Sequence, residues 1–397
     1  MLSSLQDKRN FLFFIIYLFF FNSFALQLGD GTTENQLFPK CVLTDVESVY
    51  ATDVYSVVLK KDLSVWATGL YAQPFPYVRD ECSDCNSFIK IKDSVKKIFS
   101  NINILLENDT LLHPDPKSMY FSDIFFAETA KNVTYFYEED YVCAFISKDK
   151  SLWMYGAELR DIEILKYSTD YIYYPFSEKI KKVDDNVLDV ISKNNILIYL
   201  KEDGTVWGMG SNYQGRLSKS QEKVISKPIK IAESISKIYV NDYVFLITNK
   251  NDLVKIENGE ASFVDRDIKE ISDFFYIKNN GQLFAFGFSS YGALGIGDAE
   301  GYLVQPRYVM DNVKKAKGTE FHSLILTNDN KLFSCGGGWC NFGCIGDGTR
   351  QKRDTPVLIM DDVKDFDISN YHSMVIKNDD SLWAFGLNNT NEYELGL

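Results

Sequence analysis

Short stretches of alternating apolar and polar residues recur along the whole chain. Residues 322–335 (HSLILTNDNKLFSC) and 372–385 (HSMVIKNDDSLWAF) share one phrase, in which an apolar run of period two, a polar pair and a second short run follow each other. Weaker copies lie at residues 55–69, 141–156 and 195–210. The phrase is typical of a β-hairpin, and its recurrence is typical of a propeller or a repeat array. No long stretch has the i, i+3, i+4, i+7 spacing of a helix, so the pattern predicts an all-β fold.

The second run of each hairpin gives the length of the repeat. Successive second runs are separated by 46, 41, 54, 47, 30, 49 and 50 residues, and their first residues are Val65, Leu111, Leu152, Val206, Leu253, Leu283, Leu332 and Leu382. Glycine-containing segments at 211–220, 289–298 and 339–348 follow three of the copies, and each is followed by a proline, namely Pro228, Pro306 and Pro356. Proline lacks an amide donor and therefore favours an edge strand or a first strand position. One repeat thus holds about four short strands, which is the size of a propeller blade.

The order of these features resembles the repeat of the regulator of chromosome condensation family. The matching order is His-Ser-apolar, an Asp-rich turn, Leu-Trp-aromatic-Gly, Asn-x-Tyr-Gly-x-Leu-Gly-x-Gly-Asp and then Pro, and it is best at residues 281–310 and 322–397. The units near 95–112 and 243–256 are degenerate. The resemblance implies a closed β-propeller, for which the family usually uses seven four-stranded blades. Eight candidate units leave both seven and eight blades open.

The two ends of the chain predict how the ring closes. Glu394-Leu395-Gly396-Leu397 matches the first half of one unit, and Leu28-Gly29-Asp30-Gly31-Thr32 with Pro39 matches its second half. We expect the last blade to be completed by the N-terminal strand, so that the ring has no unpaired sheet edges.

Residues 1–25 have the three-part plan of a secretory signal peptide. Lys8 and Arg9 precede an apolar run over residues 11–21, and Asn22-Ser23-Phe24-Ala25 offers small residues for cleavage before Leu26. The run is shorter than the ~20 residues that span a bilayer. We therefore expect residues 26–397 to form a single propeller domain that is secreted or exposed at the cell surface, with no membrane span after cleavage. The alternative is an uncleaved anchor whose apolar tract continues to Leu28.

The charge balance argues against one activity that the family resemblance implies, which is docking to chromatin. The best-known family activity is nucleotide exchange on the nuclear GTPase Ran, combined with chromatin docking. This chain has 42 Lys and Arg against 55 Asp and Glu, a net charge of −13. Nucleic-acid binding depends on phosphate neutralisation by basic residues, so we expect no nucleic-acid partner. The basic run at residues 350–353 is interpreted as a solvated loop.

Cysteine and histidine usage gives no metal site. Only one Cys-x-x-Cys and three histidines occur, whereas a structural zinc site needs paired cysteine or histidine ligands. In an oxidising compartment the closely spaced cysteines are disulfide candidates: Cys82, Cys85, Cys335, Cys340 and Cys344. Cys143 lies in an apolar strand and is expected to be a buried free thiol, and Cys335 has the alternative of being a core residue.

No catalytic signature is present. His322 and His372 stand where other repeats have Tyr55 and Tyr141, so they are interpreted as packing or hydrogen-bonding groups. Asp379-Asp380 lies in the hairpin turn of the repeat, and turn chemistry explains it. The chain has no nucleophile elbow, phosphate-binding loop or zinc-protease motif, so we expect no enzymatic activity and no cofactor.

Binding residues are sought in the loops, since rigid blades present variable loops. The longest irregular insertions are 70–93, 113–132 and 157–178, and aromatic residues in the glycine-containing segments give four contact candidates: Trp339, Phe342, Tyr291 and Tyr213. Three sequons give the glycosylation candidates Asn108, Asn132 and Asn388, of which Asn388 is expected to be the most accessible.

Together these features favour a secreted, monomeric, non-enzymatic propeller that binds a protein partner through the loops on one face. One alternative is an intracellular exchange factor or scaffold for a small GTPase, which requires that the N-terminal tract is not a signal. Another is a protein that binds or acts on glycans, with acidic pairs supplying the chemistry.

Overall fold

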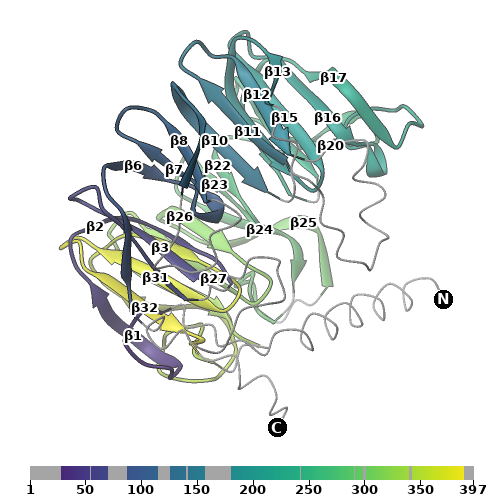
Figure 1. Cartoon of the computed structure of the whole chain (residues 1–397). Helices are drawn as coiled ribbons and strands as arrows, with labels where there is room; N and C mark the ends of the chain where they lie inside the picture. The colour runs from purple at the N-terminus through teal and green to yellow at the C-terminus, as the bar shows by residue number, and fades with distance from the viewer. Residues whose placement is uncertain are drawn as a thin grey trace, which may run out of the picture.

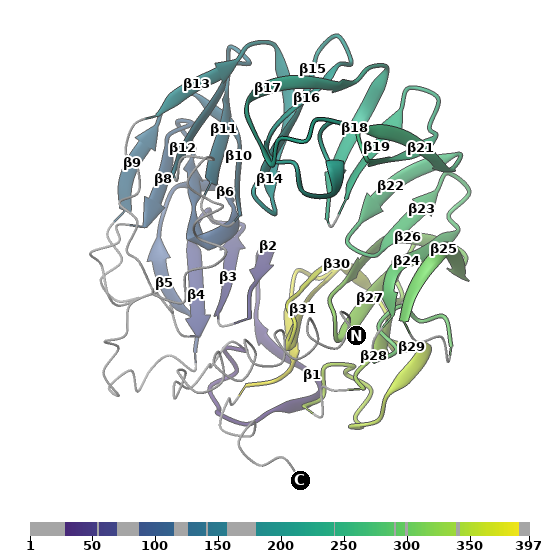
Figure 2. The same cartoon turned by 90° about the vertical axis from the view of Figure 1, so that its right-hand side faces the viewer.

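The chain folds into a ring of eight antiparallel sheets (Figure 2). The computed structural model describes residues 28–388 apart from 54, 70–86, 115–125, 140–141, 157–179, 242, 290, 298–300 and 339–341. Each sheet has four strands, and the sheets follow each other around the ring in chain order. The predicted β-propeller is confirmed, and the number of blades is eight rather than seven.

Within each blade the four strands follow one another from the ring axis to the outer rim. In blades 1 to 4 they are β2 (Val46–Ala51), β3 (Tyr55–Lys60), β4 (Val65–Gly69) and β5 (Ile89–Lys92); β6 (Val95–Ile98), β7 (Ile104–Leu106), β8 (Leu111–Pro114) and β9 (Phe126–Ala130); β10 (Val133–Glu139), β11 (Val142–Ser147), β12 (Leu152–Gly156) and β13 (Lys181–Asp184); β14 (Val187–Lys193), β15 (Ile196–Lys201), β16 (Val206–Ser211) and β17 (Val224–Ala232). In blades 5 to 8 they are β18 (Ile235–Val240), β19 (Val244–Thr248), β20 (Leu253–Glu257) and β21 (Glu260–Asp265); β22 (Ile268–Ser272), β23 (Phe275–Lys278), β24 (Leu283–Ser289) and β25 (Gly301–Met310); β26 (Val313–Gly318), β27 (His322–Thr327), β28 (Leu332–Gly336) and β29 (Arg353–Met360); β30 (Val363–Ile368), β31 (His372–Lys377), β32 (Leu382–Gly386) and β1 (Gln36–Leu43). Two short 3-10 turns, η1 (Ser100–Ile102) and η3 (Tyr213–Gly215), lie between strands.

The repeat positions from the sequence correspond to one strand of each blade. All eight second-run positions begin the third strand of a blade, from Val65 in β4 to Leu382 in β32. The interval of 30 residues is short because β20 and β21 are joined by Asn258-Gly259 alone. The predicted insertions were too long, since β5 and β9 occupy part of 70–93 and of 113–132.

The prolines occupy outer strands, as predicted. Pro228, Pro306 and Pro356 lie in β17, β25 and β29, which are the outermost strands of their blades. Each of these strands has a register shift where the proline interrupts its pairing with the third strand. A residue without an amide donor is tolerated there because the strand is an edge.

The ring is closed by the N-terminal strand. Strand β1 pairs antiparallel with β32, from Gln36 opposite Gly386 to Leu43 opposite Leu382 (Figure 1, purple beside yellow). The Leu28 amide donates to the Asn388 carboxamide oxygen over 3.2 Å. The predicted closure is confirmed, but the expectation of no unpaired edges is wrong, because among the described residues no strand pairs with the outer side of the outermost strand of any sheet.

A repeated backbone hydrogen bond joins each blade to the next. The first amide of each innermost strand donates, over 2.8–3.0 Å, to a carbonyl in the second-to-third-strand turn of the preceding blade: Val46 to Asp380, Val95 to Leu63, Val133 to Asp109, Val187 to Lys150, Ile235 to Gly204, Ile268 to Asn251, Val313 to Gly281 and Val363 to Asn330. Every accepting residue has a positive φ, between 61° and 83°. The left-handed conformation of these turns therefore accompanies the same blade-to-blade bond at all eight interfaces, including the closing one.

The hydrophobic core lies between neighbouring blades. Buried clusters combine residues of consecutive sheets, as where Leu324 and Leu326 of blade 7 pack with Val375 and Phe385 of blade 8. Trp383 is partly buried against this cluster, and its indole donates to the Ser381 hydroxyl over 2.8 Å. Trp66, Trp153 and Trp207 make the same kind of bond to a nearby hydroxyl, which agrees with their predicted packing role. In the described part of the chain, no helix has the length and apolar character needed to cross a membrane.

Candidate functional site

The two faces of the ring differ in regularity. One face carries the turns between second and third strands and the turns between blades, and we call it the hairpin face. The other carries the first-to-second-strand turns and the third-to-fourth-strand connections, and we call it the loop face. The hairpin face repeats the same turn eight times, whereas connections on the loop face range from Asn258-Gly259 to the stretch 157–180. Binding residues are found more often on variable loops than on regular turns, so the loop face is the candidate surface.

Two of the four predicted contact residues lie in one aromatic cluster of the loop face. Tyr291 packs against Phe321 with 5.7 Å between ring centroids, and Phe321 stacks on Tyr371 at 5.8 Å. Phe342 belongs to the same cluster, where it packs with Phe321 and Leu387. The cluster joins residues of blades 6, 7 and 8.

The members of this cluster have different exposures. Tyr291 is 38% exposed, whereas Phe342 and Phe321 are only 9% and 7% exposed. Phe342 is therefore a buried packing residue of the cluster, and its predicted role as a contact residue does not fit its burial. Tyr291 also has a φ of 55°, a conformation that is rare for a bulky residue. Its carbonyl accepts from the Gly338 amide over 3.1 Å, which holds the strained turn in place.

The other two candidates are separate from this cluster. Tyr213 is 53% exposed and lies in blade 4, where the Arg216 guanidinium is 5.9 Å from its ring centroid. Trp339 lies outside the described residues.

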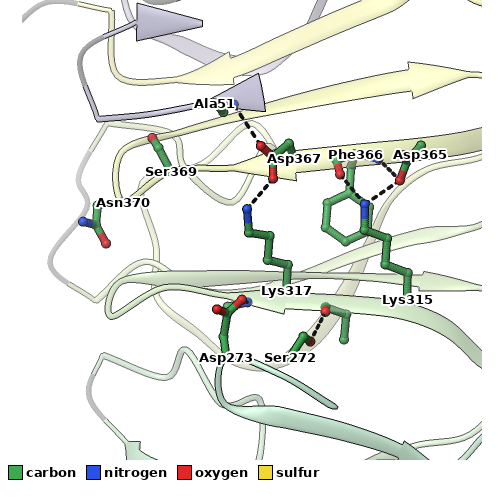
Figure 3. A network of polar contacts seen from close by, with 12 residues as sticks. Ala51, Ser272, Asp273, Lys315, Lys317, Asp365, Phe366, Asp367, Ser369 and Asn370 are labelled. Atoms are coloured by element: carbon green, nitrogen blue, oxygen red, sulfur yellow. Dashed lines mark hydrogen bonds and ion pairs between the residues drawn. The ribbon is translucent and has the colours of Figure 1, made fainter. Parts of the chain in front are cut away.

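Charged side chains of the innermost strands β26 and β30 contact each other near the loop face (Figure 3). The Lys317 ammonium, from the innermost strand of blade 7, donates to the Asp367 carboxylate of blade 8 over 2.5 Å. The other Asp367 oxygen accepts from the Ala51 amide of blade 1 over 2.9 Å. One side chain thus bridges three blades. The side chain of Lys317 is 33% exposed and that of Asp367 is 11% exposed, so the lysine end of this ion pair is the more accessible to water.

The electrostatics of Lys317 follow from its two carboxylate neighbours. Its enclosure disfavours the charge, but Asp367 and Asp273 together raise the pKa of Lys317 above its ordinary value. Lys317 is therefore a permanent cation in a structural ion pair. A second lysine of the same strand, Lys315, donates to Asp365 over 2.5 Å and to the Phe366 carbonyl over 2.7 Å (Figure 3).

Polar side chains in the first-to-second-strand turns extend this network around the axis. The Asn194 carboxamide donates to the Asn241 carbonyl over 2.8 Å, and the Asn241 carboxamide donates to the Asp273 carbonyl over 3.0 Å. Across the closing interface, the Asn370 amide and carboxamide each donate to Asp53 over 2.9 Å. Burial raises the pKa of Asp53 although Asn370 opposes this shift. The turns that carry the aromatic cluster are thereby fixed to one another across blade boundaries.

The two repeated histidines have the structural role expected of them. His322 contacts the Ser373 hydroxyl at 2.9 Å, and His372 contacts the Ser56 and Ser369 hydroxyls at 2.8 and 2.9 Å. Both imidazoles are fully buried. Burial lowers the pKa of His322 to about 4 and, with a contribution from His322, the pKa of His372 to about 3. Both are neutral near neutral pH, and each joins its blade to the next.

The cysteines that can be placed are mostly free thiols. Cys143 is free and buried, as predicted, and Cys41 is free and exposed. Cys335 is also free and buried, so the disulfide prediction for it is wrong and its alternative role in the core is confirmed. Its sulfur lies 3.4 Å from the Ala293 carbonyl. Cys82, Cys85 and Cys340 lie outside the described residues, and a disulfide of Cys344 with one of them stays a prediction.

Of the three sequons, the one expected to be most accessible is buried. Asn388 has no exposed surface, and its carboxamide donates to the Thr32 carbonyl over 2.8 Å and to Asp30 over 3.1 Å. The residue resembled a loop position in sequence, but it is part of the closing interface. Asn108 and Asn132 are exposed, and both lie in turns of the hairpin face.

Within the described part of the chain, no group of three or more His, Cys, Asp or Glu side chains could hold a metal ion. A groove of about 530 Å³ runs beside Asn132 and Trp153, between blades 2 and 3. The Trp153 ring stacks on Phe145, and the Lys182 ammonium lies 5.9 Å from its centroid, so the ring faces that a sugar would stack on are already in contact.

The residues of the axial network were not found from the sequence, nor were Phe321 and Tyr371 of the aromatic cluster. Lys317, Asp367 and Asp273 lie at or just beyond the ends of innermost strands, and Phe321 and Tyr371 each directly precede the repeated histidine. Lys317 and Asp367 stand at the same position of their strands, four residues after Val313 and Val363, so a register alignment of the innermost strands would have brought out this pair.

Comparison with known proteins supports the fold and the repeat type. No family profile matches the chain. A stretch of 84 residues is 34% identical to the ultraviolet-B receptor UVR8 of Arabidopsis thaliana, over 20% of this chain and 19% of that protein, so the match spans about a fifth of that relative. The crystal structure of human WBSCR16 matches over 88% of this chain and 89% of that one, with a TM-score of 0.52 and 14% identity. Prp20p from Saccharomyces cerevisiae gives a TM-score of 0.49 at 12% identity, over 88% of this chain and 85% of that one. The local match to UVR8 and the fold shared with WBSCR16 support the resemblance of these repeats to those of the regulator of chromosome condensation family.

Proposed function

We propose that this chain is a secreted or cell-surface, non-enzymatic propeller that binds a protein partner through its loop face. The observation that carries the proposal is the aromatic cluster, in which a strained and exposed Tyr291 packs against the buried ring of Phe321, and Phe321 packs in turn with the buried Phe342. Exposed aromatic residues on a rigid base are frequent centres of binding energy. Strained residues are enriched at functional sites, because the surrounding structure must offset their cost.

The axial network supports a rigid binding face. The hydrogen bonds of Asp367, Asn241 and Asn370 tie the loop-face turns of neighbouring blades together. A surface fixed in this way loses little conformational entropy when a partner binds.

The exposed sequons favour the same face. Asn108 and Asn132 lie on the hairpin face, so glycans attached there would cover part of that face and leave the loop face open. Secretion itself is supported by the signal-like plan of residues 1–25. Expression of the full chain in a secreting cell should release a protein that begins at Leu26, and retention in the cytosol would favour the exchange-factor alternative.

The binding proposal is tested by affinity capture with residues 26–397 and two variants. Tyr291→Ala removes the exposed ring of the cluster and should weaken the affinity for the captured partner by about tenfold or more. Tyr308→Ala removes a ring that is 48% exposed on the outer strand of blade 6, and it should bind as the unchanged chain does. A partner lost equally with both variants, or with neither, would exclude the loop-face cluster as the binding site. A small GTPase as the captured partner would replace the proposal with the exchange-factor alternative.

A further inference from the structure

The outer strand of blade 5 is an edge without the protection that the other outer strands have. Strands β1, β17, β25 and β29 each contain a proline, and β5, β9 and β13 have only four or five residues. Strand β21, with the sequence EASFVD, has six residues and contains neither proline nor lysine. Proline, lysine and shortness are the usual means by which proteins prevent strands from pairing at an edge.

The backbone of β21 presents hydrogen-bonding groups at this edge. Asn258 and Gly259 have φ values of 52° and 68°, which are those of a two-residue type I′ hairpin turn. In such a hairpin the flanking pair, Glu257 and Glu260, exchanges both hydrogen bonds. Since the pattern alternates along the strand, the amide and carbonyl groups of Ala261 and Phe263 point away from β20. These groups are the ones that a further strand would bind.

The side chains of β21 are also open to solvent. The first four residues are exposed, and Phe263 is 57% exposed. The connection to β20 is the two-residue turn, so the strand reaches the outer rim without a long connection at its loop-face end (Figure 2, β21 at the rim).

The sequence of β21 is complementary to itself in one antiparallel register. With Phe263 opposite the Phe263 of a second copy, the outward amide and carbonyl of each Phe263 meet those of the other. The same register places Glu260 of each strand opposite Arg266 at the strand end of the other, so each Arg266 joins Lys219, the partner of Glu260 within the chain, beside one carboxylate. A shift by one residue opposes Glu260 with Asp265, which is a like-charge contact, and directs the backbone groups of Ser262 away from the interface.

We propose that the chain forms a homodimer in which the β21 strands of two copies pair antiparallel about Phe263. The four-stranded sheet of blade 5 then continues into that of the second copy as one eight-stranded sheet. Such pairing along a strand edge supplies affinity through main-chain hydrogen bonds and specificity through the alternate side chains. The dimer differs from the monomer expected from the sequence.

The proposed dimer leaves the loop face free. Strand β21 lies on the outer rim, whereas Tyr291 and its cluster lie on the loop face of blades 6 to 8. A dimer would present two loop faces, and a partner with two copies of its epitope would bind more tightly by avidity. Dimerisation does not depend on the proposed binding function, and either can fail alone.

Sedimentation velocity of residues 26–397 from about 1 to about 100 µM tests the proposal in the range where weak homodimers are populated. We expect a concentration-dependent dimer. Its dissociation constant should rise by about tenfold or more in Phe263→Lys, because a lysine on an edge strand disfavours pairing with another strand. Tyr308→Lys is the matched control, since Tyr308 is the register partner of the second residue of β24 as Phe263 is of the second residue of β20, on a strand that already contains Pro306. It should dimerise as the unchanged chain does.

A charge exchange tests the register. Glu260→Arg and Arg266→Glu should each weaken the dimer, and the double variant should restore it, since the charges then face each other again with the signs reversed. A chain that stays monomeric over the whole range overturns the proposal. So does a dimer that responds equally to Phe263→Lys and Tyr308→Lys, or to neither.

Discussion

The two buried histidines predict a loss of stability in mild acid. In the native ring the imidazoles of His322 and His372 are neutral, with pKa values of about 4 and about 3, whereas in the unfolded chain a histidine has a pKa of about 6.5. The unfolded chain therefore binds more protons, and the stabilisation is complete above pH ~6.5 and is lost as the pH falls toward 4. This direction is the one expected for groups whose pKa is lowered on folding.

The size of the effect follows from the two shifts. At about pH 4.5 each imidazole costs about 2.5 kcal/mol of unfolding free energy, so both together cost about 5 kcal/mol. For a ring of this size, 5 kcal/mol corresponds to a fall of about 6 °C in Tm at the unfolding entropy typical of globular proteins. Carboxylates also titrate in this range, so the effect must be measured as a difference between proteins.

The assay is differential scanning calorimetry at about pH 7 and about pH 4.5 on the unchanged chain and on His322→Gln/His372→Gln, in which nothing titrates at these positions. The double variant is expected to be less stable at neutral pH but to lose about 5 kcal/mol less on acidification. His113→Gln, which removes the third and partly exposed histidine, is the control and should follow the unchanged chain. Equal acid losses in the unchanged chain and the double variant would refute the reasoning.

Three further predictions concern the closing interface, the axis and the thiols. Asn388→Ala should lower the unfolding free energy by about 3 kcal/mol, because it leaves buried partners of its carboxamide without hydrogen bonds. Lys317→Met should cost about 1–3 kcal/mol, since it leaves Asp367 unpaired while the partly exposed axis limits the penalty, and Lys315→Met should cost less, because Asp365 is 47% exposed. In the native protein Cys41 should react with a thiol reagent, whereas Cys335 should react only after unfolding, since burial raises the pKa of the Cys335 thiol to about 12.

Each of these has a clear contrary result. An Asn388→Ala variant with unchanged Tm would show that this carboxamide does not stabilise the closing interface. Equal destabilisation by Lys317→Met and Lys315→Met would show that the burial of Asp367 has no energetic consequence. Fast labelling of Cys335 in the native chain would contradict its place in the core.

The repeat made much of the fold predictable. A period-two run, a turn and an aromatic residue recur because each blade needs the same hairpin, so the third strands could be placed from Val65 to Leu382. The halves of one unit at the chain ends predicted the pairing of β1 with β32, since a closed ring must join them. The buried role of the repeated histidines followed from their exchange with tyrosine in register.

The contacts between blades were not predictable from the repeat. Asn388 has the sequence of an exposed sequon, yet closure of the ring places Leu28 and Asp30 around its carboxamide. Lys317 and Asp367 are charged residues in otherwise ordinary strands, and only the ring geometry brings them together. The exposure of Phe342 depended in the same way on Phe321, which lies in another turn of its blade.

The central claim is that a partner binds the loop face, and hydrogen exchange on the complex tests it most directly. With the captured partner bound to residues 26–397, the account predicts slower exchange in the loop-face segments 291–297, 319–321 and 369–371, and unchanged exchange in the hairpin-face turns 328–330 and 378–380. Protection confined to the hairpin face or to the outer rim would contradict the account.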